Sequence, residues 1–266
     1  MDRIPKKIHY CWFGRGQLPE DVKGYIETWK KQCPDYEIKE WNEDNFDINC
    51  NKYVKQAYEA KRFAFVSDYA RVYALYNEGG IYMDTDVEVL RPLDEFLKHN
   101  AFTSFENNDF IMTGLIGSER NGEWVKSVLE LYKDISFIKE DGTLDLTTNV
   151  ARITEMMENK YNFIKKSSYQ DLGTITIYPH DYFSPKDWET GNIYITENTY
   201  AIHHFNGSWH TGKEKKRLEK RKKCIEKYGE EKGKKLFDRK ERVKRFIVNL
   251  IKKPIKFVYK KLIKRG

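Results

Sequence analysis

Apolar and polar residues alternate between strand-like and helix-like spacings through the first ninety residues. KKIHYCW and YEIKEW have the pattern of strands, and PEDVKGYIETWKKQCPDY between them has the pattern of a helix bounded by Pro19 and Pro34. After a helical stretch over 53–61, AFVSDYARVYALYNEGG predicts the clearest helix, which Gly79 and Gly80 end. IYMDTDVEVL then has the pattern of a strand. This order predicts an α/β domain with a mostly parallel sheet.

The second half of the chain is less regular and predicts an α+β extension of the same domain. AFTSF, DFIMTGLIGS, TITIYP and NIYITENTYAIHHF have strand patterns, and EWVKSVLELYKDI and TTNVARITEMMENK have the pattern of amphipathic helices. No run approaches the ~20 apolar residues of a membrane-spanning helix. The N-terminus lacks the apolar stretch of a signal peptide, and the four cysteines form no CxxC pair. We therefore expect a cytoplasmic protein.

Charge divides the chain into two unequal parts. The net charge is +7. Residues 213–266 contain 24 basic and 7 acidic residues, a net charge of +17, and residues 1–212 have a net charge of −10. The expected organisation is a domain over 1–212 followed by a basic, helical tail over 213–266.

The strand over 81–90 carries the sharpest chemical signal. Alternation places Asp84, Asp86 and Glu88 on one face, where three carboxylates repel each other unless a cation lies among them. Asp84 and Asp86 at a strand end can both reach one Mg²⁺ or Mn²⁺ ion, and open α/β sheets bind ligands at such ends. The alternative is an exposed strand edge without a ligand.

The preceding helix places Asp68 and Arg71 three residues apart beside an apolar stripe. The pair is either a structural ion pair or a rigid polar group that binds sugar hydroxyls in the space left by small neighbours.

Two aromatic segments complete the candidates. HHFNGSWH over 203–210 offers imidazoles for a metal and the indole of Trp209 for a sugar or phosphate; His203 and His204 would point to opposite sides of a strand. Trp12, next to a glycine-containing turn, can stack on a base. Each segment can equally be a packed turn or a core anchor.

Together, IPKKIHYCWFG, SDYARVYALYNEGGIYMDTDV and HHFNGSW resemble glycosyltransferase family 32, over about residues 3–210. The resemblance implies a GT-A fold and a retaining hexosyltransferase that uses a nucleotide sugar, UDP-linked or else GDP-linked, with Mn²⁺ or Mg²⁺. Bacterial members make capsule or lipopolysaccharide O-antigen, which implies a glycan or lipid-linked acceptor. Many members carry a TGP element where this chain has Thr148 and Asn149 in place of Gly-Pro.

The resemblance also implies roles for single residues. Asp84 and Asp86 are the DxD pair that holds the metal on the donor diphosphate, and Asp84 thereby also binds the donor. Asp68 and Arg71 contact the donor sugar, and Trp12 stacks on its base. An HxxG element over 204–207 is similar to one in related family 8 galactosyltransferases, which favours His204 as the further metal ligand. Ser208 and Trp209 lie by the diphosphate.

The basic tail has three alternative roles. Its last part, RFIVNLIKKPIKFVYKKLIKRG, is amphipathic and can lie on an anionic membrane, which would locate the enzyme peripherally on the inner face of the cell membrane. It can also bind nucleic acid, or remain solvated or form an oligomer contact. The alternative function is a nucleic-acid-binding protein or metal-dependent nuclease that uses the tail and the DxD pair, although the −10 body repels a polyanion.

Overall fold

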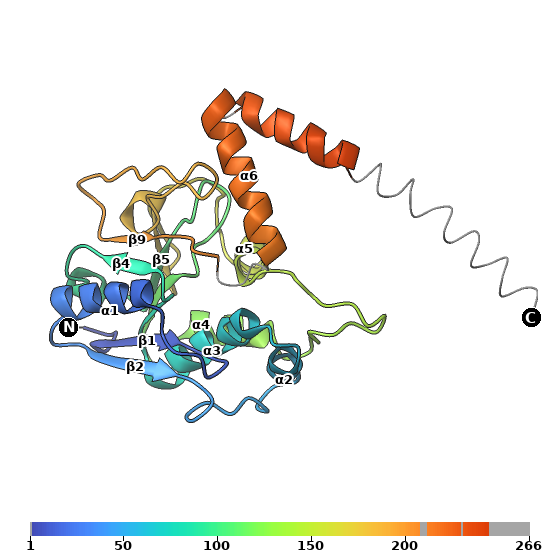
Figure 1. Cartoon of the computed structure of the whole chain (residues 1–266). Helices are drawn as coiled ribbons and strands as arrows, with labels where there is room; N and C mark the ends of the chain where they lie inside the picture. The colour runs from blue at the N-terminus through green and yellow to red at the C-terminus, as the bar shows by residue number, and fades with distance from the viewer. Residues whose placement is uncertain (1, 208–211, 230, 245–266) are drawn as a thin grey trace, which may run out of the picture. The chain divides into compact units, whose positions relative to one another are not determined.

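The computed structural model describes residues 2–207, 212–229 and 231–244 (Figure 1). Its central sheet has the order β2-β1-β3-β6-β5-β8-β7. Strands β6 and β7 are antiparallel to their neighbours, and the other five run in one direction. This confirms the predicted α/β class with a mainly parallel sheet. The strands are β1 (Lys7–Cys11), β2 (Glu37–Trp41), β3 (Gly80–Met83), β5 (Ala101–Ser104), β6 (Leu115–Ser118), β7 (Gln170–Asp171) and β8 (Thr176–Tyr178).

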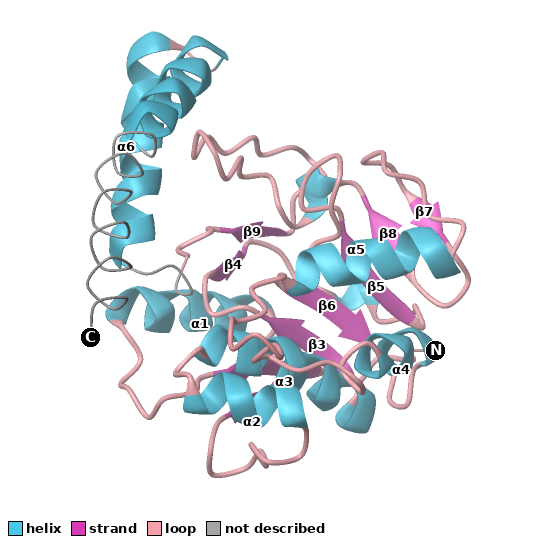
Figure 2. Ribbon diagram, turned by 90° about the vertical axis from the view of Figure 1, so that its right-hand side faces the viewer, coloured by secondary structure: helices cyan, strands magenta, loops and turns pink. Residues whose placement is uncertain are grey.

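Helices cover both faces of this sheet, as Figure 2 shows. Neighbouring residues of β1 enter different cores: Ile8 and Tyr10 pack with Trp29 of α1, while Cys11 packs with the residues around α3. Two-sided burial explains why β1 has no exposed residue. The helices are α1 (Glu20–Gln32), α2 (Lys52–Glu59), α3 (Phe63–Glu78), α4 (Glu123–Glu130), α5 (Asn149–Lys160) and α6 (Gly212–Tyr228), with short 3₁₀ turns at Asp94–Phe96 and His180–Tyr182.

The double glycine after α3 starts β3 without a loop. Gly79 and Gly80 have φ values of 66° and 113°, which side chains rarely adopt. A Cβ atom at Gly80 would lie 2.6 Å from the Lys7 carbonyl oxygen, so glycine is also needed for the close approach to β1. β3, which this connection starts, ends at Met83, directly before Asp84 of the DxD pair.

The strand expected over 81–90 is two strands. β3 ends at Met83, and β4 (Val87–Val89) pairs with β9 (Ala201–His203) in a separate antiparallel sheet. The chain turns between them because the Asp84 amide donates to the Gly114 carbonyl at 2.8 Å and the Val87 amide donates to the Asp84 carbonyl at 3.0 Å. The late strand predicted over 192–205 is likewise confined to β9.

The chain forms two compact units. Among the described residues, the first contains 2–188 and 192–207, and the second contains 189–191, 212–229 and 231–244. In the second unit, α6 and a helical segment over 231–244 follow each other through Gly229, whose φ is 78°. Ile225 and Phe237 are buried in this unit. The division at 212 stays a prediction, and 245–266 lies outside the described residues.

No described helix is long and apolar enough to span a membrane.

Candidate functional site

The turn after β3 presents the two aspartates of the motif. The Tyr82 hydroxyl donates to Asp84 Oδ1 at 2.8 Å, and the turn hydrogen bonds of Asp84 hold its backbone. Both carboxylates are half-buried. They lie at the carboxyl end of β3, where the sequence placed a cation site.

Strand β9 brings an imidazole to these carboxylates. His203 is the register partner of Val87, and its Nε2 lies 3.3 Å from Asp86 Oδ1 and 3.9 Å from Asp84 Oδ2. Ligand atoms of Asp84, Asp86 and His203 all lie within 4.8 Å of one another. Two carboxylate oxygens with one imidazole nitrogen suit a divalent cation such as Mn²⁺ or Mg²⁺.

Two further observations show that these residues fit a metal. His203 Nδ1 is buried and has no hydrogen-bond partner among the described residues, which is rare for a buried polar atom. A Cβ atom at Gly114 would lie 3.1 Å from both Asp84 Oδ2 and His203 Cε1, so the glycine keeps space open beside the ligands.

Without a metal, His203 and Asp86 stabilise each other's charge. Burial disfavours the imidazolium, but the charges of Asp86 and Asp84 outweigh it and raise the pKa of His203 to about 9. Burial also opposes ionisation of Asp86, and His203 overcomes this and lowers the pKa of Asp86 to about 2. A cation that binds here therefore replaces a proton.

Asp68 and Arg71 form a buried pair that extends to the aspartate turn. Arg71 Nη2 donates to Asp68 Oδ1 at 3.0 Å, and its Nη1 donates to the Thr113 carbonyl at 2.8 Å and lies 3.2 Å from Asp84 Oδ1. The guanidinium also lies over the Tyr82 ring. Burial raises the pKa of Asp68 to about 7, against the opposing charge of Arg71. The pair is thus an ion pair that also contacts the aspartate turn, and its role in binding a sugar stays a prediction.

The imidazole of His204, the predicted metal ligand, contacts Glu88 and Tyr25 and not the carboxylates of the aspartate pair. Its Nε2 is 2.8 Å from Glu88 Oε2, and its ring stacks on Tyr25 at 4.9 Å. β9 ends at His203, and the side chains of His203 and His204 have different carboxylate partners, Asp86 and Glu88. The structure brings the imidazole of His203 to both aspartates, whereas the ligand role predicted for His204 stays a prediction.

The other predicted residues have different outcomes. Trp12 is partly buried against the core, and its Nε1 donates to the Gly16 carbonyl at 2.7 Å, so its role in base stacking stays a prediction. Ser208 and Trp209 lie outside the described residues.

One acidic residue near the site, Glu106, could not be recognised as a site residue from the sequence. Glu106 follows β5 without a motif around it, yet its pKa is raised by burial and by the charges of Asp84 and Asp86, with His203 opposing them. Only the packing of β5 against β6 and β8 brings this segment to the aspartate turn.

The sequence of this region has recognisable relatives. Residues 19–103 match the family model described as "Glycosyltransferase sugar-binding region containing DXD motif". Residues 19–103 are therefore similar to a DXD-containing sugar-binding region of glycosyltransferases. Inositol phosphoceramide mannosyltransferase 1 of Schizosaccharomyces pombe is 26% identical over 113 residues, which are 38% of this chain and 34% of that protein. An uncharacterized glycosyltransferase of Acanthamoeba polyphaga mimivirus is 24% identical over 226 residues, which are 77% of this chain and 84% of that protein.

The match spans about a third of the length of the two yeast mannosyltransferases that the chain resembles. Among solved structures, the PaToxG glycosyltransferase has a TM-score of 0.41 at 20% identity, with 49% of this chain and 60% of that chain covered. The galactosyltransferase LgtC has a TM-score of 0.40 at 13% identity, with 77% and 90% covered. Scores at this level add nothing to the topology described above.

Proposed function

We propose that this chain is a divalent-metal-dependent glycosyltransferase that moves a hexose from a nucleotide sugar to a glycan acceptor. The observation that carries the proposal is the convergence of Asp84, Asp86 and His203 within 4.8 Å, inside a DXD-type region. The buried Asp68–Arg71 pair next to this group supplies the polar contacts that a sugar ring requires.

Different residues would bind the metal, orient its ligands and contact the sugar of the donor. Asp84, Asp86 and His203 would hold a Mn²⁺ or Mg²⁺ ion that neutralises the donor diphosphate and the charge that develops on the leaving group. Arg71 fixes Asp84 through its Nη1, and Tyr82 fixes it through its hydroxyl. Asp68 accepts from Arg71 with one oxygen, which leaves the other to accept from a sugar hydroxyl.

The proposal includes retention of the anomeric configuration, which the sequence resemblance implies. The acceptor hydroxyl attacks from the face of the leaving diphosphate, and a diphosphate oxygen takes its proton. No enzyme nucleophile takes part in this route, so a trapped covalent glycosyl-enzyme would contradict it.

The acceptor is proposed to be lipid-linked and to belong to surface polysaccharide synthesis, such as capsule or O-antigen. A relative whose name includes inositol phosphoceramide, a lipid, supports the lipid-linked acceptor. We also propose that the protein works in the cytoplasm, peripherally on the inner face of the cell membrane, through its basic C-terminal part.

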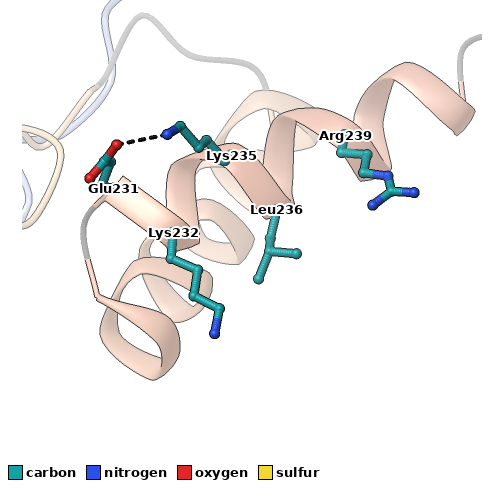
Figure 3. A pocket seen from close by; sticks show the side chains of 5 residues that line it. All are labelled: Glu231, Lys232, Lys235, Leu236 and Arg239. Carbon is teal, nitrogen blue, oxygen red and sulfur yellow. Dashed lines mark hydrogen bonds and ion pairs between the residues drawn. The ribbon is translucent and has the colours of Figure 1, made fainter.

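The second unit offers a cationic face for this contact. Lys232, Lys235 and Arg239 line one shallow groove with Leu236 and with Glu231, which pairs with Lys235 at 2.7 Å (Figure 3). The groove belongs to the C-terminal helices, whereas the metal-ligand candidates belong to the first unit. Cations around an apolar side chain suit anionic headgroups over acyl chains.

Incubation with a panel of UDP- and GDP-linked hexoses and Mn²⁺ tests the activity. We expect free nucleoside diphosphate from one donor, and NMR of the transferred sugar should show the anomeric configuration of that donor. Absence of turnover with every donor would reject the proposal.

A further inference from the structure

Asn149, the first residue of α5, has a buried amide nitrogen without a partner. The residue is 6% exposed, and its Nδ2 has no hydrogen-bond partner among the described residues. Its Oδ1 accepts from the Val150 amide at 2.8 Å and from the Thr113 hydroxyl at 3.2 Å. Because a backbone amide can only donate, the Val150 contact fixes which end of the side chain is oxygen. The nitrogen therefore keeps two donor hydrogens available for a ligand.

The role of helix cap belongs to a different residue. Thr148 is the N-cap of α5, and its hydroxyl accepts from the Ala151 amide at 3.3 Å. Asn149 is thus not required to start the helix. A buried donor without a partner is disfavoured unless something else uses it.

One hydrogen-bond network joins Asn149 to the metal-ligand group. The hydroxyl of Thr113 donates to Asn149 Oδ1, and the carbonyl of Thr113 accepts from Arg71 Nη1 at 2.8 Å. Arg71 in turn contacts Asp68 at 3.0 Å and Asp84 at 3.2 Å. Thr113 therefore links the side chain of Asn149 to the Arg71 guanidinium that contacts the aspartate turn.

The chemistry of Asn149 and Asp68 favours a neutral polyol as the ligand. The amide of Asn149 donates, and the free oxygen of Asp68 accepts, so together they match hydroxyl groups, which both donate and accept. A second phosphate would meet the carboxylate of Asp68 without a cation of its own, because Arg71 is already held by Asp68 and Asp84.

We propose that Asn149 donates a hydrogen bond to one hydroxyl group of the transferred sugar and so selects among nucleotide sugars. The proposal rests on the glycosyltransferase function above and adds a specificity residue to it. A site built to pair with a hydroxyl discriminates against analogues that lack it, because the buried group then stays unpaired.

Deoxy donors test this contact. The wild-type chain and Asn149→Ala are compared on the preferred donor and on its monodeoxy analogues, one for each ring hydroxyl, by nucleoside diphosphate release. In the wild type, one analogue should lose about 10- to 100-fold in kcat/KM. Asn149→Ala should lose a similar factor on the parent donor and show no further loss on that same analogue.

Two variants complete the design. Asn149→Asp keeps the shape of the side chain without its donor, so it should behave like Asn149→Ala even if the smaller side chain disturbs packing. Glu155→Ala, at an exposed position on the same helix, should keep the wild-type pattern.

The outcomes separate the two proposals. If the variants and the wild type lose the same factor on every analogue, Asn149 contacts no hydroxyl and the inference is overturned while the enzyme class stands. If the wild type turns over no nucleotide sugar, the proposed function fails and the inference falls with it.

Discussion

Asp86 is oriented by the segment around β9 before any ligand binds. The His204 amide donates to its carbonyl at 2.9 Å, and the Asn206 amide donates to its Oδ2 at 2.7 Å. Phe205 between them has a φ of 54°, a conformation that costs a non-glycine residue roughly 1–2 kcal/mol. The hydrogen bonds on either side of Phe205 hold the Asp86 carboxylate in place despite this cost.

The two neighbouring histidines give a matched pair of variants. His203→Ala removes an imidazole that faces both aspartates, so we expect the affinity for Mn²⁺ to fall by at least about tenfold. His204→Ala removes the contact with Glu88 and should leave the affinity within about twofold. Calorimetric titration with Mn²⁺ measures both, and equal losses would contradict the assignment of His203.

The raised pKa of His203 predicts a pH dependence with a defined sign. The protonated imidazole stabilises the metal-free fold fully below pH 6.5, and this stability is lost as pH rises through about 9. Mn²⁺ must displace the proton, so its apparent affinity should rise with pH over this window, by up to about tenfold per unit.

His203→Gln serves as the control for this prediction. Without the imidazole, both the metal affinity and the free energy of unfolding should lose this dependence between pH 6.5 and 9. Affinity of the wild type that falls with rising pH would contradict the prediction.

At the scale of elements, the chain order α3–β3–turn could be predicted because it depends on local signals. The double glycine ends a helix and starts a strand, and the spacing of Asp68 and Arg71 places both on one helix face. The choice between His203 and His204 could not be predicted. It depends on the register of β9 against β4, two strands more than a hundred residues apart, and alternation alone allows either face.

Long-range packing also explains what else the sequence did not reveal. Nothing near Glu106 distinguishes it from a solvated polar residue, and Asn149 stands out in the sequence only as a departure from the TGP element. The sheet order and the contact of Asn149 with Thr113 relate these two residues to the site. The prediction of one strand over 81–90 was wrong because two hydrogen bonds, from the Asp84 amide to Gly114 and from the Val87 amide to Asp84, turn the chain in the middle of this segment.

The close approach at Gly80 predicts a large stability effect. Gly80→Ala places a Cβ 2.6 Å from the Lys7 carbonyl in a left-handed conformation, so we expect a loss of about 2–4 kcal/mol in the free energy of unfolding. Gly24→Ala is the matched control, since Gly24 lies inside α1 with no atom near a new Cβ, and it should gain about 0.5–1 kcal/mol. Urea denaturation measures both, and equal effects would contradict the account.

For the whole molecule, the division of charge predicts how the protein meets a membrane. The triple variant Lys232→Glu, Lys235→Glu and Arg239→Glu reverses the cationic face, so binding of the full chain to vesicles with anionic lipid should fall by at least about tenfold. The same reversal at the exposed Lys126, Lys133 and Lys139 of the first unit is the control and should change binding much less. Co-sedimentation measures both, and equal losses would reject the C-terminal contact.

Restoration of turnover by metal tests the central claim most directly. The chain is treated with a chelator, and nucleoside diphosphate release from the preferred donor is followed as Mn²⁺ is returned. We expect wild type and Asp109→Asn, at an exposed position, to recover fully, and Asp84→Asn to stay at least about a hundredfold slower. Turnover that persists without metal, or that Asp84→Asn retains, would contradict a metal-dependent glycosyltransferase built on the turn after β3.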